Sequence, residues 1–232
     1  MTRRLAVAAM ALCLPLAAKA PKAAMPVITD ERVDFAPGGA IEVTGSVGEL
    51  NIEAWDGPDV QITVTRSTYR TDTPRERDLA QRQLSAVKVT AERKSPAEIS
   101  IHTSIPPRGF WAKVARRGRN YRLDYRIRVP RDTTLVLRHG SGNVFVHDVA
   151  GDIDASVRTG DIVLQLPAAG SYSFDAQCGF GGVYSDFAGN YRTGHLVSER
   201  FAQSGTSPAK QVHLRVGIGG ITIQKAALAA TM

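Results

Sequence analysis

The sequence predicts an all-β fold, a β-solenoid (β-helix-like) stack of short coils punctuated by glycine, with one α-helix inserted near residues 74–86. Segments that alternate between apolar and polar residues run through the chain, whereas the apolar spacing of a helix occurs in one segment. Glycine also opens strand-like segments at regular intervals in the second half. A constant interval of this kind indicates one structural unit that is stacked repeatedly.

The first half of the chain contains three expected strands. Residues 41–43 and 60–64 alternate, and residues 48–52 begin with glycine in the same way as the later repeats. A turn at residues 56–58, Asp-Gly-Pro, separates the last two strands. These segments therefore begin the β-domain.

The expected helix follows directly. Thr73-Pro74-Arg75-Glu76 is a capping box with proline at the first helical position. The apolar residues after it have helical spacing: Leu79, Ala80, Leu84 and Val87. Alternation then resumes at 87–89, 99–101 and 121–129, which indicates further strands.

Four glycine-led strand starts carry the repeat. They are Gly142-Asn143-Val144, Gly160-Asp161-Ile162, Gly181-Gly182-Val183 and Gly219-Gly220-Ile221. The first two intervals between these starts are close to one copy of a unit, and the third is close to two copies. Gly151 lies midway between the first two starts, so each half-unit holds a strand of about five residues and a tight turn. Glycine, Asn and Asp suit that turn because they tolerate positive φ.

Residues 181–190 resemble a second copy of residues 142–152, which supports the interpretation as a repeat. An antiparallel sandwich with glycine turns is the alternative. Strand parity predicts which side chains face the core. The expected inward residues are Val144, Val146, Ile153, Ile162, Leu164, Val183, Ile221 and Ile223. The expected outward residues are Phe145, Asp154 and Val163.

The N-terminus has the pattern of a secretory signal peptide over residues 1–20. Arg3 and Arg4 precede an apolar run at 5–14, and small residues follow, so cleavage is expected between residues 18 and 26. The expected location is then the periplasm or cell surface. We expect a single β-repeat domain at 27–225 and a short tail at 226–232.

Positive charge is concentrated in one insert. The whole chain has a formal net charge of +7, and residues 106–122 hold six basic and no acidic residues. Arginines with aromatic neighbours suit an anionic envelope surface or glycan. The candidate binding residues are Arg108, Phe110, Trp111, Lys113, Arg116, Arg117, Arg119 and Arg122. The alternatives are a mobile hairpin loop or a solvated insert. Because the basicity is local, no nucleic-acid partner is expected.

The sequence lacks the familiar signatures of catalysis. It contains no G-x-S-x-G, no G-x-x-x-x-G-K and no H-E-x-x-H motif, and its G-x-G pairs lack a third glycine. Asp152 and Asp154 could suggest a cation, but their spacing does not fit a calcium loop, so they are interpreted as solvated turn residues. Cys178 is interpreted as a structural thiol. We therefore expect no catalytic site, metal or cofactor.

The order of these motifs resembles the bacterial putative-adhesin family of β-strand-repeat domains. The resemblance rests on the leader, the capped helix before 87–89, the strand ending at Pro130, and the glycine starts at 141–144 and 159–162. It implies an envelope protein of unknown chemistry and brings no functional residues with it. The expected function is a non-enzymatic adhesin-like or scaffold module. The alternatives are a self-assembling β-solenoid polymer and a polysaccharide-acting enzyme.

Overall fold

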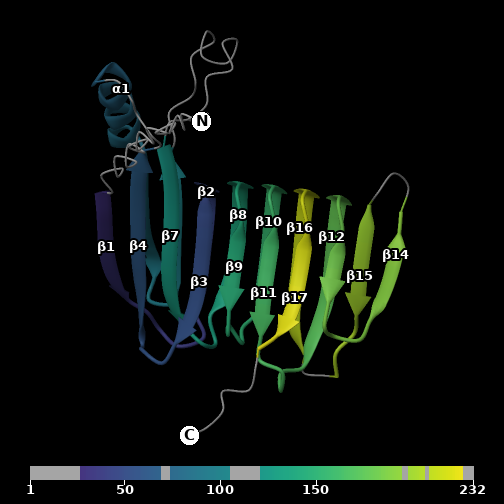
Figure 1. The fold of residues 1–232 in the computed structure, drawn as a ribbon. Helices are drawn as coiled ribbons and strands as arrows, with labels where there is room; N and C mark the ends of the chain where they lie inside the picture. The colour runs from purple at the N-terminus through teal and green to yellow at the C-terminus, as the bar shows by residue number, and fades with distance from the viewer. Residues whose placement is uncertain (1–26, 69–73, 105–120, 195–197, 207–208, 227–232) are drawn as a thin grey trace, which may run out of the picture.

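The computed structural model describes residues 27–68, 74–104, 121–194, 198–206 and 209–226 (Figure 1). The predicted signal peptide, and all but the first residue of the predicted tail, lie outside the described residues. The part that is described forms seventeen strands and one helix, in two mixed sheets. The prediction of an all-β fold is thus confirmed.

The first sheet, sheet A, has eight strands. In spatial order they are β1 (Val27–Asp34), β4 (Asp59–Thr68), β7 (Tyr121–Pro130), β3 (Glu49–Trp55), β9 (Val144–His147), β11 (Ile162–Leu166), β17 (Ile221–Lys225) and β13 (Val183–Ser185). Sheet B has nine strands. In spatial order they are β14 (Asn190–Thr193), β15 (Glu199–Gln203), β12 (Tyr172–Phe180), β16 (Lys210–Ile218), β10 (Ile153–Thr159), β8 (Thr134–Ser141), β2 (Ala40–Val47), β6 (Glu98–Ser104) and β5 (Lys88–Ser95).

Glycine turns carry the chain from sheet B to sheet A. β2 leads to β3, β8 to β9, β10 to β11, β12 to β13 and β16 to β17, and the neighbouring strands in this region are parallel. Each turn has a glycine with positive φ: Gly48, Gly142, Gly160, Gly181 and Gly219. These turns stack so closely that a Cβ on Gly160 would lie 2.0 Å from the carbonyl oxygen of Gly142. Only glycine fits such a turn.

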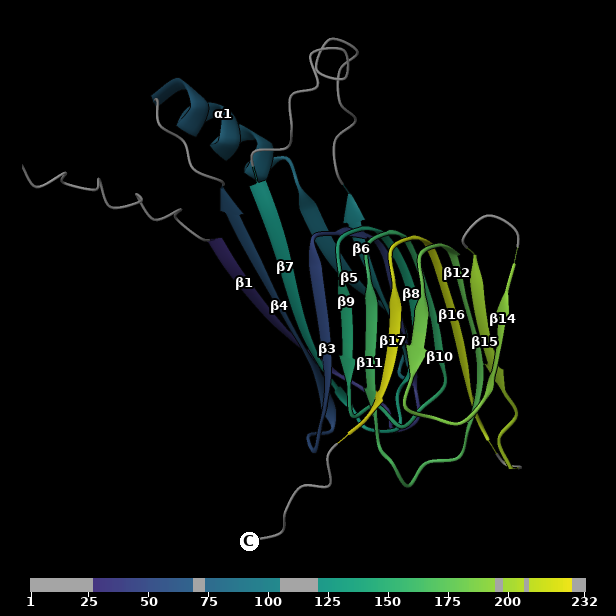
Figure 2. The ribbon, with the colours of Figure 1, turned by 45° about the vertical axis from the view of Figure 1, so that its right-hand side comes forward.

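The strands do not stack in chain order. β17 lies between β11 and β13, and β3 lies between β7 and β9. The long interval from Gly181 to Gly219 therefore does not represent two successive coils, because Gly219 stacks on Gly160 and Gly181 stacks on Gly219. The chain makes the excursion β14–β15 after β13 and returns through β16 to fill the intervening place (Figure 2).

The second copy of the repeat is interrupted. Residues 181–185 form a glycine turn and β13 as expected, but β14 does not occupy the place equivalent to β10. It pairs antiparallel with β15, and its residues are all exposed. The structural similarity between residues 181–190 and 142–152 is therefore limited to the glycine turn and the strand after it, β13.

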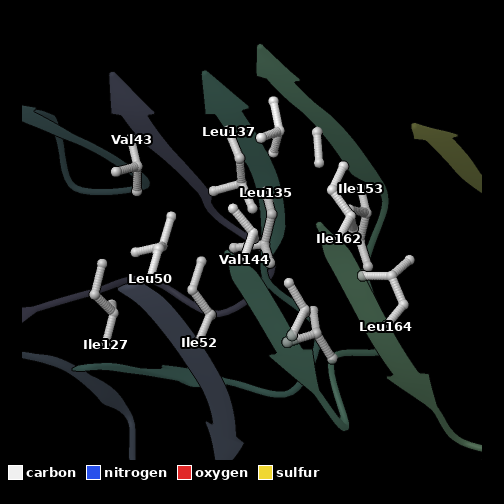
Figure 3. Packing of buried hydrophobic residues seen from close by; sticks show 14 of the residues in the cluster. Val43, Leu50, Ile52, Ile127, Leu135, Leu137, Val144, Ile153, Ile162 and Leu164 are labelled. Atoms are coloured by element: carbon white, nitrogen blue, oxygen red, sulfur yellow. The ribbon is translucent and has the colours of Figure 1, made fainter. Parts of the chain in front are cut away.

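The core lies between the two sheets, and the predicted parity is confirmed. Every residue expected to point inward is buried, whereas Phe145, Asp154 and Val163 are not. Figure 3 shows Leu135, Leu137 and Ile153 of sheet B near Val144 and Ile162 of sheet A. Apolar burial at alternate positions of both sheets is the main stabilising contribution of this domain.

The helix α1 (Pro74–Ser85) stands beside the N-terminal end of the stack, where it contacts β4 and β7 (Figure 2). Leu84 and, just beyond the helix, Val87 are buried against the core cluster. Within the described residues, the structure has no helix with the length and apolar character needed to cross a membrane.

Candidate anion-binding face

The outer face of sheet B carries two parallel lines of polar side chains. Cross-strand pairing places Arg138, Ser156, Arg215, Gln177, Arg200 and Arg192 in one register line across six strands, from β8 to β14. We call its four arginines the arginine line. The adjacent line, the acid line, runs through Glu42, Val136, Asp154, His213, Asp175, Ala202 and Asn190. Both lines face outward, because on β2, β8, β10, β16, β12 and β15 the intervening residues are buried in the core.

Arg138 and Asp154 form a bidentate ion pair between the two lines. Arg138 Nη1 donates to Asp154 Oδ1 at 2.9 Å, and Arg138 Nη2 donates to Asp154 Oδ2 at 2.6 Å. Hydrogen bonding from Arg138 lowers the pKa of Asp154, so this carboxylate stays ionised at neutral pH. The two parallel bonds hold both side chains in a fixed orientation.

Asp175 forms ion pairs with two arginines. Arg215 Nη2 donates to its Oδ2 at 2.6 Å, and Arg200 Nε donates to its Oδ1 at 2.9 Å. His213 Nδ1 lies 4.0 Å from the same carboxylate. Burial acts to raise the pKa of Asp175, but the bonds from Arg215 and Arg200 outweigh it and lower that pKa. One negative charge is therefore shared by two positive charges.

The pattern breaks at the hairpin β14–β15. Here the acid line has Ala202 and Asn190 in place of carboxylates, while Arg192 lies directly opposite Arg200. Like charges that face each other across strands repel. Arg192 forms no ion pair with any residue in the described part of the chain. A surface hollow is lined by these same residues: Asn190, Arg192, Arg200 and Ala202.

The face has an excess of positive charge. From β8 to β14, the outward-facing charged residues are five arginines and two aspartates. The arginines are the four of the arginine line and Arg158, which lies on β10 beside that line. His213 lies between the two aspartates. Such a surface attracts anions and can bind them through the planar fork of each guanidinium group.

Most of the basic insert lies outside the described residues. This holds for Arg108, Phe110, Trp111, Lys113, Arg116, Arg117 and Arg119. Arg122 is described, on the outer face of sheet A, where it forms ion pairs with Glu49 at 2.8 Å and Asp124 at 2.7 Å. Arg122 therefore lies on a different sheet from the arginine line, which belongs to sheet B.

The polar turn residues have structural partners. Asn143 Oδ1 accepts the N–H of Asp161 at 3.2 Å, and Asp161 Oδ1 accepts the N–H of Gly220 at 2.7 Å. Asp152 Oδ1 accepts the N–H of Gln211 at 2.8 Å. These side chains connect successive turns. The described residues contain no group of three or more His, Cys, Asp or Glu arranged to hold a metal ion.

Cys178 is buried, as the sequence predicts. Its Sγ donates to the carbonyl oxygen of Gly219 at 3.0 Å, next to the stacked turns. Burial raises the pKa of the Cys178 thiol, which therefore stays protonated and weakly nucleophilic at neutral pH.

A signal for part of this face is present in the sequence. Four positions before the turn glycines Gly142, Gly160, Gly181 and Gly219 the chain has Arg138, Ser156, Gln177 and Arg215, respectively. Six positions before the same glycines it has Val136, Asp154, Asp175 and His213. Alignment on the turn glycines would have revealed both lines. Arg192 and Arg200 join them only through the pairing of β14 with β15 and of β15 with β12.

Three solved structures are similar to this chain. A "putative cell adhesion protein" from Clostridium sporogenes is 16% identical, with a TM-score of 0.49, over 86% of this chain and 100% of that chain. A "putative adhesin" from Bacteroides fragilis is 11% identical, with a TM-score of 0.30, over 88% and 98%. A "putative lipid binding protein" from Parabacteroides distasonis is 10% identical, with a TM-score of 0.26, over 88% and 95%. Two of the three are described in terms of adhesion. No family model and no curated protein matches the chain.

Proposed function

We propose that this protein is an exported, non-enzymatic, adhesin-like module of the bacterial cell envelope that binds an anionic polymer through the outer face of sheet B. The observation that carries the proposal is the excess of arginine over aspartate on that face, from β8 to β14. The ion pairs with Asp154 and Asp175 orient the arginines but leave the face positively charged. The fold serves here as a flat, rigid support of β-solenoid type, formed by one domain over residues 27–225.

Linear geometry favours a polymer over a small ligand. The arginine line crosses six strands, which at ~4.8 Å per strand corresponds to roughly 24 Å. Arg138, Arg215 and Arg200 recur on every second strand. An extended acidic polysaccharide presents its charges in a comparable linear array. The basic insert at 106–122 would provide a second contact with the same kind of ligand.

The binding test uses the mature protein and immobilised polygalacturonate, with neutral dextran as the control matrix. We expect retention on polygalacturonate at low salt and elution as ionic strength rises, because salt screens exposed charges. Passage without retention at low salt would overturn the proposal. The double variant Arg138→Gln/Arg158→Gln should elute earlier, whereas Arg126→Gln, on the outer face of sheet A, should elute with wild type.

The contribution of the insert can be separated from that of the sheet. Arg116→Gln, Arg117→Gln and Arg119→Gln together remove three charges from the insert and leave sheet B unchanged. Retention that disappears in this triple variant and persists in Arg138→Gln/Arg158→Gln would move the binding site to the insert. Export has its own test. Protein from the envelope fraction should be lighter than the full chain by roughly 2 kDa, the mass of the leader.

A further inference from the structure

The charge pattern of sheet B is incomplete at one place, and we infer that a carboxylate of the ligand completes it. The inferred subsite is the hollow on β14–β15 lined by Asn190, Arg192, Arg200 and Ala202. Its ligand is one acidic group of an acidic polysaccharide. This inference deepens the proposed function and rests on it.

The rest of the arginine line shows what the subsite lacks. Arg138 is paired with Asp154, and Arg215 and Arg200 are paired with Asp175. Each of these aspartates lies on the acid line, on a strand that neighbours the strand of its arginine. The strand of Arg192, β14, pairs with β15, whose acid-line residue is Ala202, and the acid-line residue of β14 itself is Asn190. Among the described residues, Arg192 is thus the arginine of the line that has no carboxylate at the acid-line position of a strand paired with its own.

The local chemistry suits a carboxylate from outside. Arg192 and Arg200 are register partners, and both residues border the same hollow. Asp175 already holds Arg200 at 2.9 Å and shares its charge with Arg215, so this part of the face has excess positive charge. An incoming carboxylate would relieve the repulsion between Arg192 and Arg200 and accept hydrogen bonds from either. The Asn190 amide supplies a further donor, and the small Ala202 side chain leaves room.

The acid line favours a single chain over a membrane surface. Asp154 and Asp175 flank the arginine line on one side, with exposed fractions of 46% and 22% for their side chains. A broad anionic bilayer laid on the face would meet these carboxylates as well as the arginines. A single polysaccharide chain can follow the arginine line and end in the subsite at β14. Charge complementarity therefore selects the narrower ligand.

Two opposite substitutions test the subsite, with polygalacturonate as the probe. Arg192→Gln removes one guanidinium group and should weaken binding about tenfold, as expected for the loss of one charge-assisted contact. Asn190→Asp supplies the missing carboxylate from within the protein. It should weaken binding to a similar extent and also raise the melting temperature, because Arg192 then gains an internal partner. A merely structural role for this hairpin would not couple weaker binding with higher stability.

The controls separate the subsite from the proposed function. Arg126→Gln removes a charge from sheet A and should leave the affinity for polygalacturonate unchanged. If wild type fails to bind polygalacturonate at low salt, the proposed function fails together with this inference. If wild type binds, but Arg192→Gln and Asn190→Asp bind equally well, the inference alone is overturned. Tighter, Arg192-dependent binding to phosphatidylglycerol vesicles than to polygalacturonate would overturn the choice of a polysaccharide.

Discussion

The carboxylate of Glu199 accepts a hydrogen bond of 2.8 Å from the backbone N–H of Val183, at the free edge of sheet A. The next outward N–H of β13, that of Ser185, donates to the hydroxyl of Tyr191 at 3.0 Å. β13 is an edge strand, and its other side pairs with β17. Side chains from β14 and β15 therefore occupy the donors to which another strand would otherwise bind.

Loss of this edge cap should promote self-association. Glu199→Ala leaves the N–H of Val183 without its partner, and an unpaired edge can template strand addition. We expect concentration-dependent light scattering to rise in Glu199→Ala and to stay at the monomer value in wild type. Glu53→Ala, on the outer face of sheet A, is the control and should resemble wild type. Polymers formed by wild type at the same concentration would favour the alternative of a self-assembling envelope polymer.

The stacked turns should tolerate no side chain. Gly160 has φ of +131°, and a Cβ there would lie 2.0 Å from the carbonyl oxygen of Gly142. Backbone strain alone costs ~1–3 kcal/mol, and the clash adds to it. Gly38 also has positive φ, +72°, but a Cβ there would meet nothing within 4 Å. Urea denaturation should therefore show a much larger loss of stability for Gly160→Ala than for Gly38→Ala. Equal losses would mean that the turns are not closely stacked.

Burial predicts a large difference in stability between substitutions on two strands that follow each other in the chain, β11 and β10. Ile162 is fully buried, so Ile162→Ala should reduce the free energy of unfolding by about 2–5 kcal/mol. Asp154→Ala breaks an exposed ion pair with Arg138 and should cost at most about 1 kcal/mol. Chemical denaturation of the two variants measures both values, and a similar cost for each would contradict the assigned register.

His139 should make stability depend on pH. It is buried, with Nδ1 2.7 Å from Ser46 Oγ and Nε2 3.2 Å from the carbonyl oxygen of Gly48. Burial lowers the pKa of His139 below its ordinary value of 6.5. The unfolded chain then binds a proton more readily than the folded protein, so stability is full above about pH 6.5 and falls as pH decreases below it.

Thermal denaturation between pH 7 and pH 5 measures this effect. The variant His139→Asn should be less stable than wild type at pH 7 because it loses buried contacts, but its melting temperature should change less with pH. The exposed His102 provides a matched control, since His102→Asn should retain the pH dependence of wild type. An unchanged slope in His139→Asn would assign the pH dependence to other groups.

Cys178 should react only after unfolding. The thiol is buried and its pKa is raised by burial, so little thiolate is available to a thiol reagent. We expect slow modification of the folded mature protein and rapid modification in denaturant. Rapid modification of the folded protein would show that the region around Gly219 opens readily.

The alternation of residues was sufficient to predict the core side of the strands. Val144, Ile162 and Ile221 are buried where parity requires, because each strand presents alternate side chains to opposite faces regardless of its neighbours. The turn glycines were also evident, since a left-handed backbone at Gly142 or Gly160 strongly favours glycine. These are local constraints, and each is determined within a short stretch of chain.

The order of the strands and the candidate site were determined by the tertiary structure. The local sequence of residues 181–225 does not predict that β17 lies between β11 and β13. A parallel strand can pair with any neighbour whose hydrogen bonds and core residues match. The same pairing brings Arg192 opposite Arg200 and in line with Arg138, which lies far earlier in the chain. Sequence by itself therefore determined which side chains face outward, and backbone pairing between distant segments decided which of them meet.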